Sequence, residues 1–239
     1  INKLSGASSA NLSEFSIIQT MKENFYTALG SMAKKFPQFV RDKFYIVKLY
    51  FDGLVKEEPR VKIAIQQGLS SLIDAYKNPD QELQSNFETL FLKIVLEPNR
   101  NSHAVSAVLR CTNRLFPFDH IPSRFMCLLC VDDQSLQVRE EASRGSDMER
   151  FTKYRQLDTK EEFHHPQFVT VVEYVHSFIR NPRGYALSSG SHMAIIEFMR
   201  KTMDVTAQEN KQNLENYVKS LRQSNPEIID AYTYCLQTA

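Results

Sequence analysis

Cys127 and Cys130 have the Cys-x-x-Cys spacing that is found in metal sites and in redox-active pairs. A structural zinc site needs a second such pair or histidines at ligand spacing. A redox-active pair would stand at the start of a helix that follows a strand. Here the intervening residues are Leu128 and Leu129, inside an apolar run. We therefore predict two buried core thiols that bind no metal and form no obligatory disulfide.

A second group of potential metal ligands is the run that contains Glu161, Glu162, His164 and His165. Carboxylates and imidazoles both coordinate metals, which makes this run a candidate site. Adjacent residues on a helix, however, point in different directions, and Pro166 follows at once. The run therefore fits a solvent-exposed helix start better than a metal site.

A small basic and aromatic cluster is formed by Arg150, Lys153, Tyr154 and Arg155. Such a cluster could contact nucleic acid or an acidic partner. The chain has a formal net charge of +1, which provides no bulk attraction to nucleic acid or to an anionic membrane. We therefore favour a solvated loop at this place and expect no nucleic-acid partner.

Recognisable catalytic motifs are missing from the sequence. It contains no glycine-rich phosphate loop, no Gly-x-Ser-x-Gly element and no His-Glu-x-x-His motif. We therefore expect a non-enzyme with no catalytic residue, no metal or other cofactor and no small-molecule substrate. No apolar run approaches the ~18 residues of a membrane helix, so membrane insertion is not expected. Four cysteines and no signal-peptide core indicate a reducing compartment, in the cytoplasm, the nucleus or both.

Composition and periodicity predict an all-α fold. Only 7 glycines and 9 prolines occur in 239 residues, fewer turn formers than a strand-rich fold needs. Apolar residues recur at intervals of three and four, and prolines mark the ends of these stripes. The first expected helix begins near Ser13, and Pro37 ends or kinks it. Its apolar stripe consists of Phe15, Ile18, Met21, Phe25 and Leu29.

Further helices follow at short intervals, and the apolar pattern of residues 39–146 predicts three helix pairs. One pair cannot bury its own apolar face, so stacked pairs are expected. The expected helices are Phe39 to Val55, one that begins at Pro59, one with Leu83 and Ile94, one that Ser102 caps, His120 to Val131, and one with Val138. After them come helices around Phe168 to Ile179, Met193 to Met203, Leu214 to Leu221, and one from Asn225 and Pro226.

The expected organisation has three parts. Residues 1–11 form a disordered lead-in, residues 12–156 form helical repeats, and residues 157–239 continue with further helical pairs. Charged residues 144–160 and the segment 181–191, which contains glycine and proline, are expected as connections or loops. The first residue is isoleucine rather than methionine, so we expect a piece of a longer protein.

One stretch has the form of an aspartate, a short spacer and Val-Arg-x-x-Ala. It contains Asp133, Val138, Arg139 and Ala142. An aspartate before an amphipathic run is a helix N-cap signal. Val138 and Ala142 share a helical face, and the small alanine lets a neighbouring helix approach. This form resembles the second helix of a HEAT repeat.

A weaker copy lies upstream, where Val61 and Lys62 align with Val138 and Arg139, and Gly68 aligns with Gly145. The copies are 138 − 61 = 77 residues apart, close to two helical-repeat periods of roughly 40 residues. The alternative is two unrelated amphipathic helices. Repeats of this kind predict an α-solenoid of stacked antiparallel helix pairs, like HEAT or armadillo proteins.

Arg139 is expected close to the start of its helix, where a cation is unfavourable to the helix dipole. We therefore predict that it contacts a carboxylate of an acidic turn, with Asp133 or Asp132 as the local partner. Such a contact would set the register between repeats rather than bind a substrate.

The run from Phe125 to Gly145 is similar to the extracellular mutant 29 family of proteasome adapter and scaffold proteins. Its shared features are an apolar helix, an aspartate-rich turn and then Val-Arg-Glu-x-Ala-x-x-Gly. The resemblance implies an all-helical solenoid without catalytic residues. It also implies binding to the 26S proteasome and a link from it to other cellular components. The alternatives are another HEAT or armadillo adapter, of the nuclear-transport or phosphatase-scaffold type, and an all-α enzyme.

Overall fold

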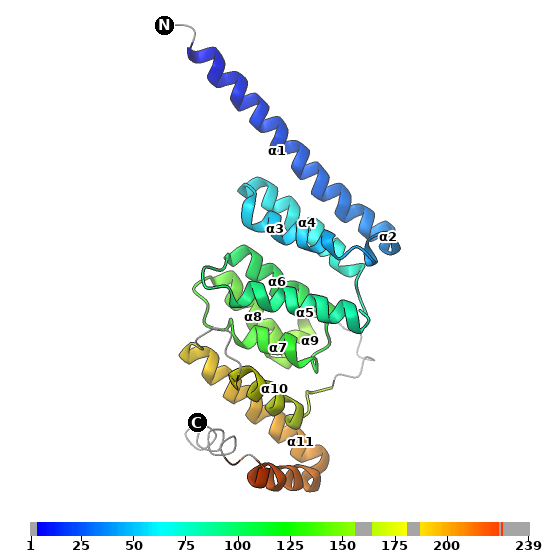
Figure 1. The fold of residues 1–239 in the computed structure, drawn as a ribbon, viewed down its shortest axis with the longest axis vertical. Helices are drawn as coiled ribbons and strands as arrows, with labels where there is room; N and C mark the ends of the chain where they lie inside the picture. Colours follow the sequence, from blue (N-terminus) through cyan, green and yellow to red (C-terminus); the bar gives the residue numbers. More distant parts are fainter. Residues whose placement is uncertain (1–3, 156–163, 181–186, 225, 227–239) are drawn as a thin grey trace. The chain divides into compact units, whose positions relative to one another are not determined.

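The computed structural model describes residues 4–155, 164–180, 187–224 and 226, which contain eleven helices and no strand (Figure 1). The predicted all-α fold is therefore confirmed. The chain divides into two compact units, residues 1–90 and residues 91–239. None of the described helices is long and apolar enough to span a bilayer. The helices are α1 (Leu4–Lys35), α2 (Pro37–Arg41), α3 (Tyr45–Lys56), α4 (Pro59–Asp74), α5 (Gln81–Leu96), α6 (Ser102–Leu115), α7 (Ile121–Leu128), α8 (Leu136–Ser146), α9 (Met148–Arg155), α10 (Phe168–Arg180) and α11 (Ser189–Ser224).

Helix α1 begins at Leu4, so the predicted disordered lead-in is wrong for residues 4–11. That segment contains alanine and leucine, which are good helix formers, and each residue added to an existing helix gains a hydrogen bond. As predicted, the helix ends before Pro37, which then occupies the first turn of α2.

The single helix predicted from Phe39 to Val55 is interrupted between α2 and α3. At the break, the Tyr76 hydroxyl donates a hydrogen bond to the Val40 carbonyl over 2.7 Å. The Val40 carbonyl also accepts the backbone N–H of Lys43 over 2.8 Å, so the buried Tyr76 hydroxyl adds a second donor where α2 ends. Tyr76 thus stabilises a break that the apolar periodicity of the segment does not reveal.

Helices α1, α3 and α4 pack together in the first unit. Helix α1 runs parallel to α4, because Glu23 pairs with Arg60 and Gly30 meets Gly68 further along both helices. Helix α3 runs antiparallel to α4, since Gly53 of α3 lies against Ile65 and Tyr50, earlier in α3, lies against Gly68, later in α4. The predicted inward face of α4 is buried as expected, through Val61, Ala64, Ile65, Gly68, Leu72 and Ile73.

In the second unit, α6 runs parallel to α8. Arg110 pairs with Glu141 over 3.3 Å, and Asn113 lies against Gly145, three and four residues further along the two helices. In a stack of antiparallel pairs, the second helices of successive pairs run parallel, as α6 and α8 do. The helix pairing is thus that of a HEAT-like α-solenoid. Asn101 caps α6, not Ser102 as predicted, because its Oδ1 accepts the backbone N–H groups of His103 and Ala104.

The connection predicted for residues 144–160 is wrong for residues 148–155, which form α9. Its apolar anchor is Phe151, which is fully buried. The predicted loop 181–191 is likewise wrong for Ser189 to Ser191, the first residues of α11. Helix α11 contains both helices predicted between Met193 and Leu221, with a break in helical geometry at Asn210. The boundary predicted at residue 156 and the helix predicted from Asn225 lie outside the described residues.

Candidate functional site

The acidic turn between α7 and α8 consists of Val131, Asp132 and Asp133. Asp133 reaches back to the loop between α5 and α6, where its Oδ2 accepts a hydrogen bond from Arg100 over 2.5 Å. The side chains of this pair are only 19% and 11% exposed, so salt screens them less than a surface pair. The pair therefore connects one helix pair to the next.

Asp132 reaches forward from the same turn to the start of α11. Its Oδ1 accepts a hydrogen bond from the Ser188 hydroxyl over 2.8 Å, and Ser188 Oγ accepts the backbone N–H of Ser191. A Cβ atom on Gly190 would lie 2.5 Å from Asp132 Oδ2, so only glycine permits this approach. A carboxylate at a helix N-terminus is favourable to the helix dipole. Asp132 thus positions α11.

The predicted contact between Arg139 and a carboxylate is wrong, because Arg139 bonds backbone carbonyl groups of the acidic turn instead. Arg139 Nη1 donates to the backbone carbonyls of Asp133 and Gln134, over 2.7 and 2.9 Å. The Asp133 carboxylate is already engaged by Arg100 and by the backbone N–H of Ser135, which precedes α8. Arg139 therefore stabilises the backbone of its own turn, and Arg100 makes the contact that sets register.

The two predicted repeat copies each place a glycine against the parallel helix before it. A Cβ atom on Gly68 would lie 2.7 Å from the Tyr26 carbonyl oxygen of α1. A Cβ atom on Gly145 would collide with Asn113 of α6 and with Cys127. Of the other motif residues, Val61, Val138 and Ala142 are fully buried, while Lys62 and Arg139 are partly exposed.

Arg124 is a charged residue that lies at the centre of the second unit without any exposure. Its Nη1 donates to the Gly145 carbonyl over 2.8 Å and to Asn113 Oδ1 over 3.2 Å. The guanidinium also lies 4.5 Å from the centre of the Phe151 ring, a cation–π contact. Burial lowers the pKa of Arg124 to about 10, so the group stays charged at neutral pH. Arg124 joins α6, α7, α8 and α9.

Cys127 and Cys130 are buried free thiols, as predicted. Cys127 Sγ lies 3.6 Å from Asn113 Oδ1, to which it donates a weak hydrogen bond. Burial raises the pKa of the Cys127 thiol to about 11 and that of Cys130 to about 12. Thiols that stay protonated are poor nucleophiles and poor metal ligands.

The predicted histidine run lies before α10 rather than in a helix. His164 is exposed, while the ring of His165 packs edge-on against Phe118 at 5.6 Å between ring centres. Burial lowers the pKa of His165, which favours the neutral ring. Glu161 and Glu162 lie outside the described residues, and within the described ones no cluster of three metal ligands occurs.

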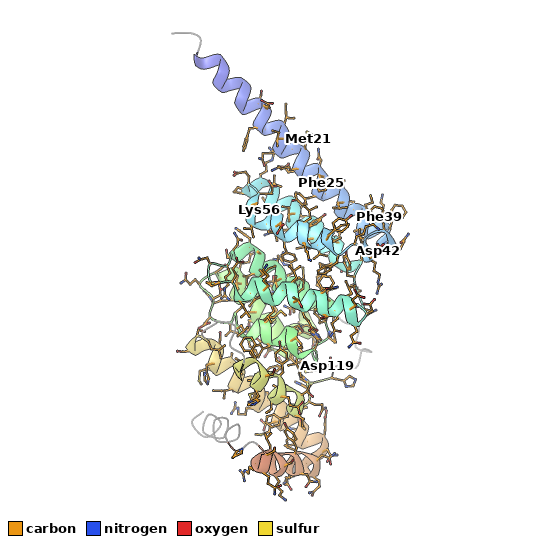
Figure 2. The ribbon with its side chains drawn as sticks, viewed as in Figure 1. Met21, Phe25, Phe39, Asp42, Lys56 and Asp119 are labelled. Atoms are coloured by element: carbon orange, nitrogen blue, oxygen red, sulfur yellow. The ribbon has the colours of Figure 1, made fainter. Side chains whose placement is uncertain are left out.

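Most of the predicted apolar stripe of α1 faces solvent, whereas its last member, Leu29, is half-buried. Met21 is 66% exposed and Phe25 is 51% exposed (Figure 2). On the neighbouring face, Ala33 is fully buried, Tyr26 contacts α3 and α4, and Gly30 contacts α4. The open stripe contains Phe15, Ile18, Met21, Phe25 and Met32.

A basic surface hollow of about 550 Å³ lies between α8 and α9. It is lined by Glu140, Arg144, Arg150, Lys153 and Tyr154. Three residues of the predicted basic cluster are thus brought together with Arg144. The fourth, Arg155, instead donates to the Arg114 carbonyl over 3.0 Å.

The sequence did not point to Arg124 or Arg100, and it pointed to Asp132 only as a partner of Arg139. One signal for Arg124 exists, since it is the lone charge in the apolar run from Ile121 to Leu128. The pairing of Arg100 with Asp133 and that of Asp132 with Ser188 had no local signal, because these partners lie 33 and 56 residues apart.

The family model for the N-terminal part of proteasome component ECM29 matches residues 2–130, which include helices α1–α7. The chain belongs to the ECM29 family. Among curated relatives, the human proteasome adapter and scaffold protein ECM29 is 32% identical over 119 residues. The proteasome component ecm29 of Schizosaccharomyces pombe is 25% identical over 207 residues.

These ECM29 relatives are much longer than the chain. The human alignment covers 50% of the chain and 6% of the relative, and the fission-yeast alignment covers 80% and 12%. The comparison with solved structures found no match. The resemblance noted between Phe125 and Gly145 is thus supported by a family match that covers more than half of the chain.

Proposed function

We propose that this chain is a non-catalytic scaffold segment that binds the 26S proteasome and links it to other cellular components. The observation that carries the proposal is the ECM29 family match over residues 2–130. The names of both relatives describe proteasome components or adapters, which supports the same partner here. Stacked helices offer long, exposed surfaces to protein partners.

The polar groups of the second unit support a non-catalytic role. A hollow of about 620 Å³ borders the acidic turn, and Asp132 and Asp133 line it. Both carboxylates are occupied by the chain's own serine and arginine groups. An active site instead presents poised acids, bases or nucleophiles to a substrate. These residues serve to position helices, which speaks against the all-α enzyme.

Binding is tested with the tagged chain immobilised on resin and incubated with purified 26S proteasome. Retention of proteasome subunits is expected, and a chain that retains none at micromolar concentration would overturn the proposal. Two matched variants then locate the contact. Met21→Glu with Phe25→Glu changes exposed positions in the first unit, and Leu136→Glu with Met193→Glu changes exposed positions in the second.

We extend the proposal to localisation in the cytoplasm, the nucleus or both, where thiols stay reduced. The buried free cysteines Cys111, Cys127 and Cys130 fit a reducing compartment. Fluorescence imaging of the tagged full-length protein tests this, and accumulation in the secretory pathway would contradict it.

A further inference from the structure

More cations than anions line the basic surface hollow between α8 and α9. Three of its lining residues are cations (Arg144, Arg150 and Lys153), and one, Glu140, is an anion. The segment that supplies Arg150 and Lys153 is helical and is anchored by the buried Phe151. These cations are therefore held on a structured surface rather than on a solvated loop.

The arginines of the hollow are positioned by neighbours on the same unit. Arg144 Nη1 pairs with Glu141 Oε1 over 2.8 Å, and its guanidinium lies 5.3 Å from the centre of the Tyr154 ring. Arg150 Nη1 donates to the Ser143 hydroxyl. Side chains already held in place lose less conformational entropy on binding a ligand.

The local carboxylates do not neutralise these cations. The buried Glu141 carboxylate is shared between Arg144 and Arg110, so one negative charge serves two guanidinium groups. Lys153 is 80% exposed, and its contact with Glu149 is long, at 3.9 Å between two solvated groups. Exposed pairs of this kind contribute little, about 0–1 kcal/mol. The residues that line the hollow, three cations and Glu140, have a formal net charge of 3 − 1 = +2.

We propose that this basic surface hollow binds a carboxylate-rich segment of a partner protein. Guanidinium forks bind carboxylates with two parallel hydrogen bonds, and the Tyr154 ring provides an apolar wall for the segment's aliphatic carbons. The volume lies within the usual ~300–1,000 Å³ of binding pockets, enough for a few side chains. The inference rests on the proposed function in that it assumes a protein partner.

Nucleic acid fits this surface less well. Its phosphates form a continuous line of negative charge that would pass the carboxylates of Glu140 and Glu149. The chain's formal net charge of +1 provides no long-range attraction for a polyanion. A short acidic peptide segment fits better, because its few separate carboxylates can lie on the three cations without forming a continuous line of charge past Glu140.

The test is fluorescence anisotropy with the full chain and a fluorescein-labelled peptide of about ten residues in which Glu alternates with Ser. Arg150→Glu with Lys153→Glu is expected to weaken binding at least about tenfold, because two attractive charges become repulsive. Arg200→Glu with Lys201→Glu is the matched control on α11, with the same residue types and the same change of charge. It is expected to change the affinity less than about twofold.

Equal weakening by both variants would overturn the proposal, since it would show attraction to overall charge alone. Absence of peptide binding to the wild-type chain would also overturn it. Binding of a labelled uridylate decamer that outcompetes the peptide, with the same loss at Arg150 and Lys153, would assign the hollow to nucleic acid instead. Far-UV circular dichroism checks folding, and Arg150→Gln with Lys153→Gln replaces the charge reversal if that variant unfolds.

The peptide assay and the proteasome assay fail independently. A chain that retains the proteasome but does not bind the peptide overturns only the role of the hollow. A chain that binds the peptide but retains no proteasome overturns the proposed partner and leaves the hollow as an acidic-segment site.

Discussion

In residues 1–90 the helices meet through glycine and tyrosine, whereas in residues 91–239 they meet through buried charged and amide groups. Gly30 and Gly68 bring the backbones of α1 and α4 into contact, and the Tyr50 hydroxyl donates to the Tyr26 carbonyl over 2.7 Å. In the second unit, Arg124 and Asn113 hold α6, α7 and α8 through directional hydrogen bonds.

The two units also differ in what they leave exposed. Among the described residues, twelve of the fourteen large exposed hydrophobic side chains lie in the first unit and two, Leu136 and Met193, in the second. Close glycine contacts bury one face of α1 but leave its phenylalanine and methionine stripe open. The second unit uses its buried polar groups to set the direction of each helix. Helices of one fold class are thus held together by close packing in the first unit and by directional hydrogen bonds in the second.

The largest expected effect tests the buried polar network. Arg124→Ala removes a fully buried side chain, takes this donor from the Gly145 carbonyl and leaves Asn113 Oδ1 with the weak Cys127 thiol donor. We expect a loss of about 3–5 kcal/mol in the free energy of unfolding, measured by urea titration followed by circular dichroism. Arg200→Ala, at a half-exposed arginine, is the control and should change it by less than about 0.5 kcal/mol. A loss of unfolding free energy at Arg124 as small as that of the control would show that buried hydrogen bonds do not hold the second unit together.

The next effect tests the glycine contact of the first unit. Gly68→Ala would normally stabilise a helix by roughly 0.5–1 kcal/mol. Here the new methyl group would lie 2.7 Å from the Tyr26 carbonyl, so we expect a loss of about 1–3 kcal/mol instead. Urea unfolding gives the sign of the change in unfolding free energy, which shows whether the clash outweighs the gain in helix propensity. Thr27→Ala, at an exposed position of α1, is the control. A stabilised Gly68→Ala chain would show that α1 does not pack against α4 at this point.

A smaller effect separates the two arginines of the acidic turn. A double-mutant cycle between Arg100 and Asp133 should give a coupling energy of about 1–2 kcal/mol, because the pair is mostly buried. A cycle between Arg139 and Asp133 side chains should give less than about 0.5 kcal/mol, since Arg139 bonds only backbone carbonyls there. A larger coupling energy for Arg139 than for Arg100 would instead support the predicted contact between Arg139 and the Asp133 carboxylate.

The smallest effect concerns the open face of α1. Met21→Glu places a charge at a position that is 66% exposed, so the unfolding free energy should change by less than about 0.5 kcal/mol. The comparison variant Ala33→Glu, on the fully buried face of the same helix, should cost several times more. Equal losses at the two positions in thermal and urea unfolding would show that both faces of α1 are covered.

Local patterns in the sequence were enough to place most of the helices. Periods of three and four in apolar residues, ended by proline, located α4, α5 and α6 closely, because these signals act within a few residues of one another. The same local pattern predicted that Cys127 and Cys130 are buried. The run around Asp133 and Arg139 was sufficient to indicate the ECM29 family.

Only the tertiary structure decided which partners these helices and side chains have. The stripe with Phe15 and Phe25 is as apolar as a packed face, and its periodicity does not tell whether another helix covers it. Arg139 was adjacent in sequence to the acidic turn, yet Arg100, 33 residues from Asp133, binds the carboxylate. Contacts between distant residues depend on how complete helices pack, and this packing is set by the sum of many weak interactions that no single stretch of sequence contains.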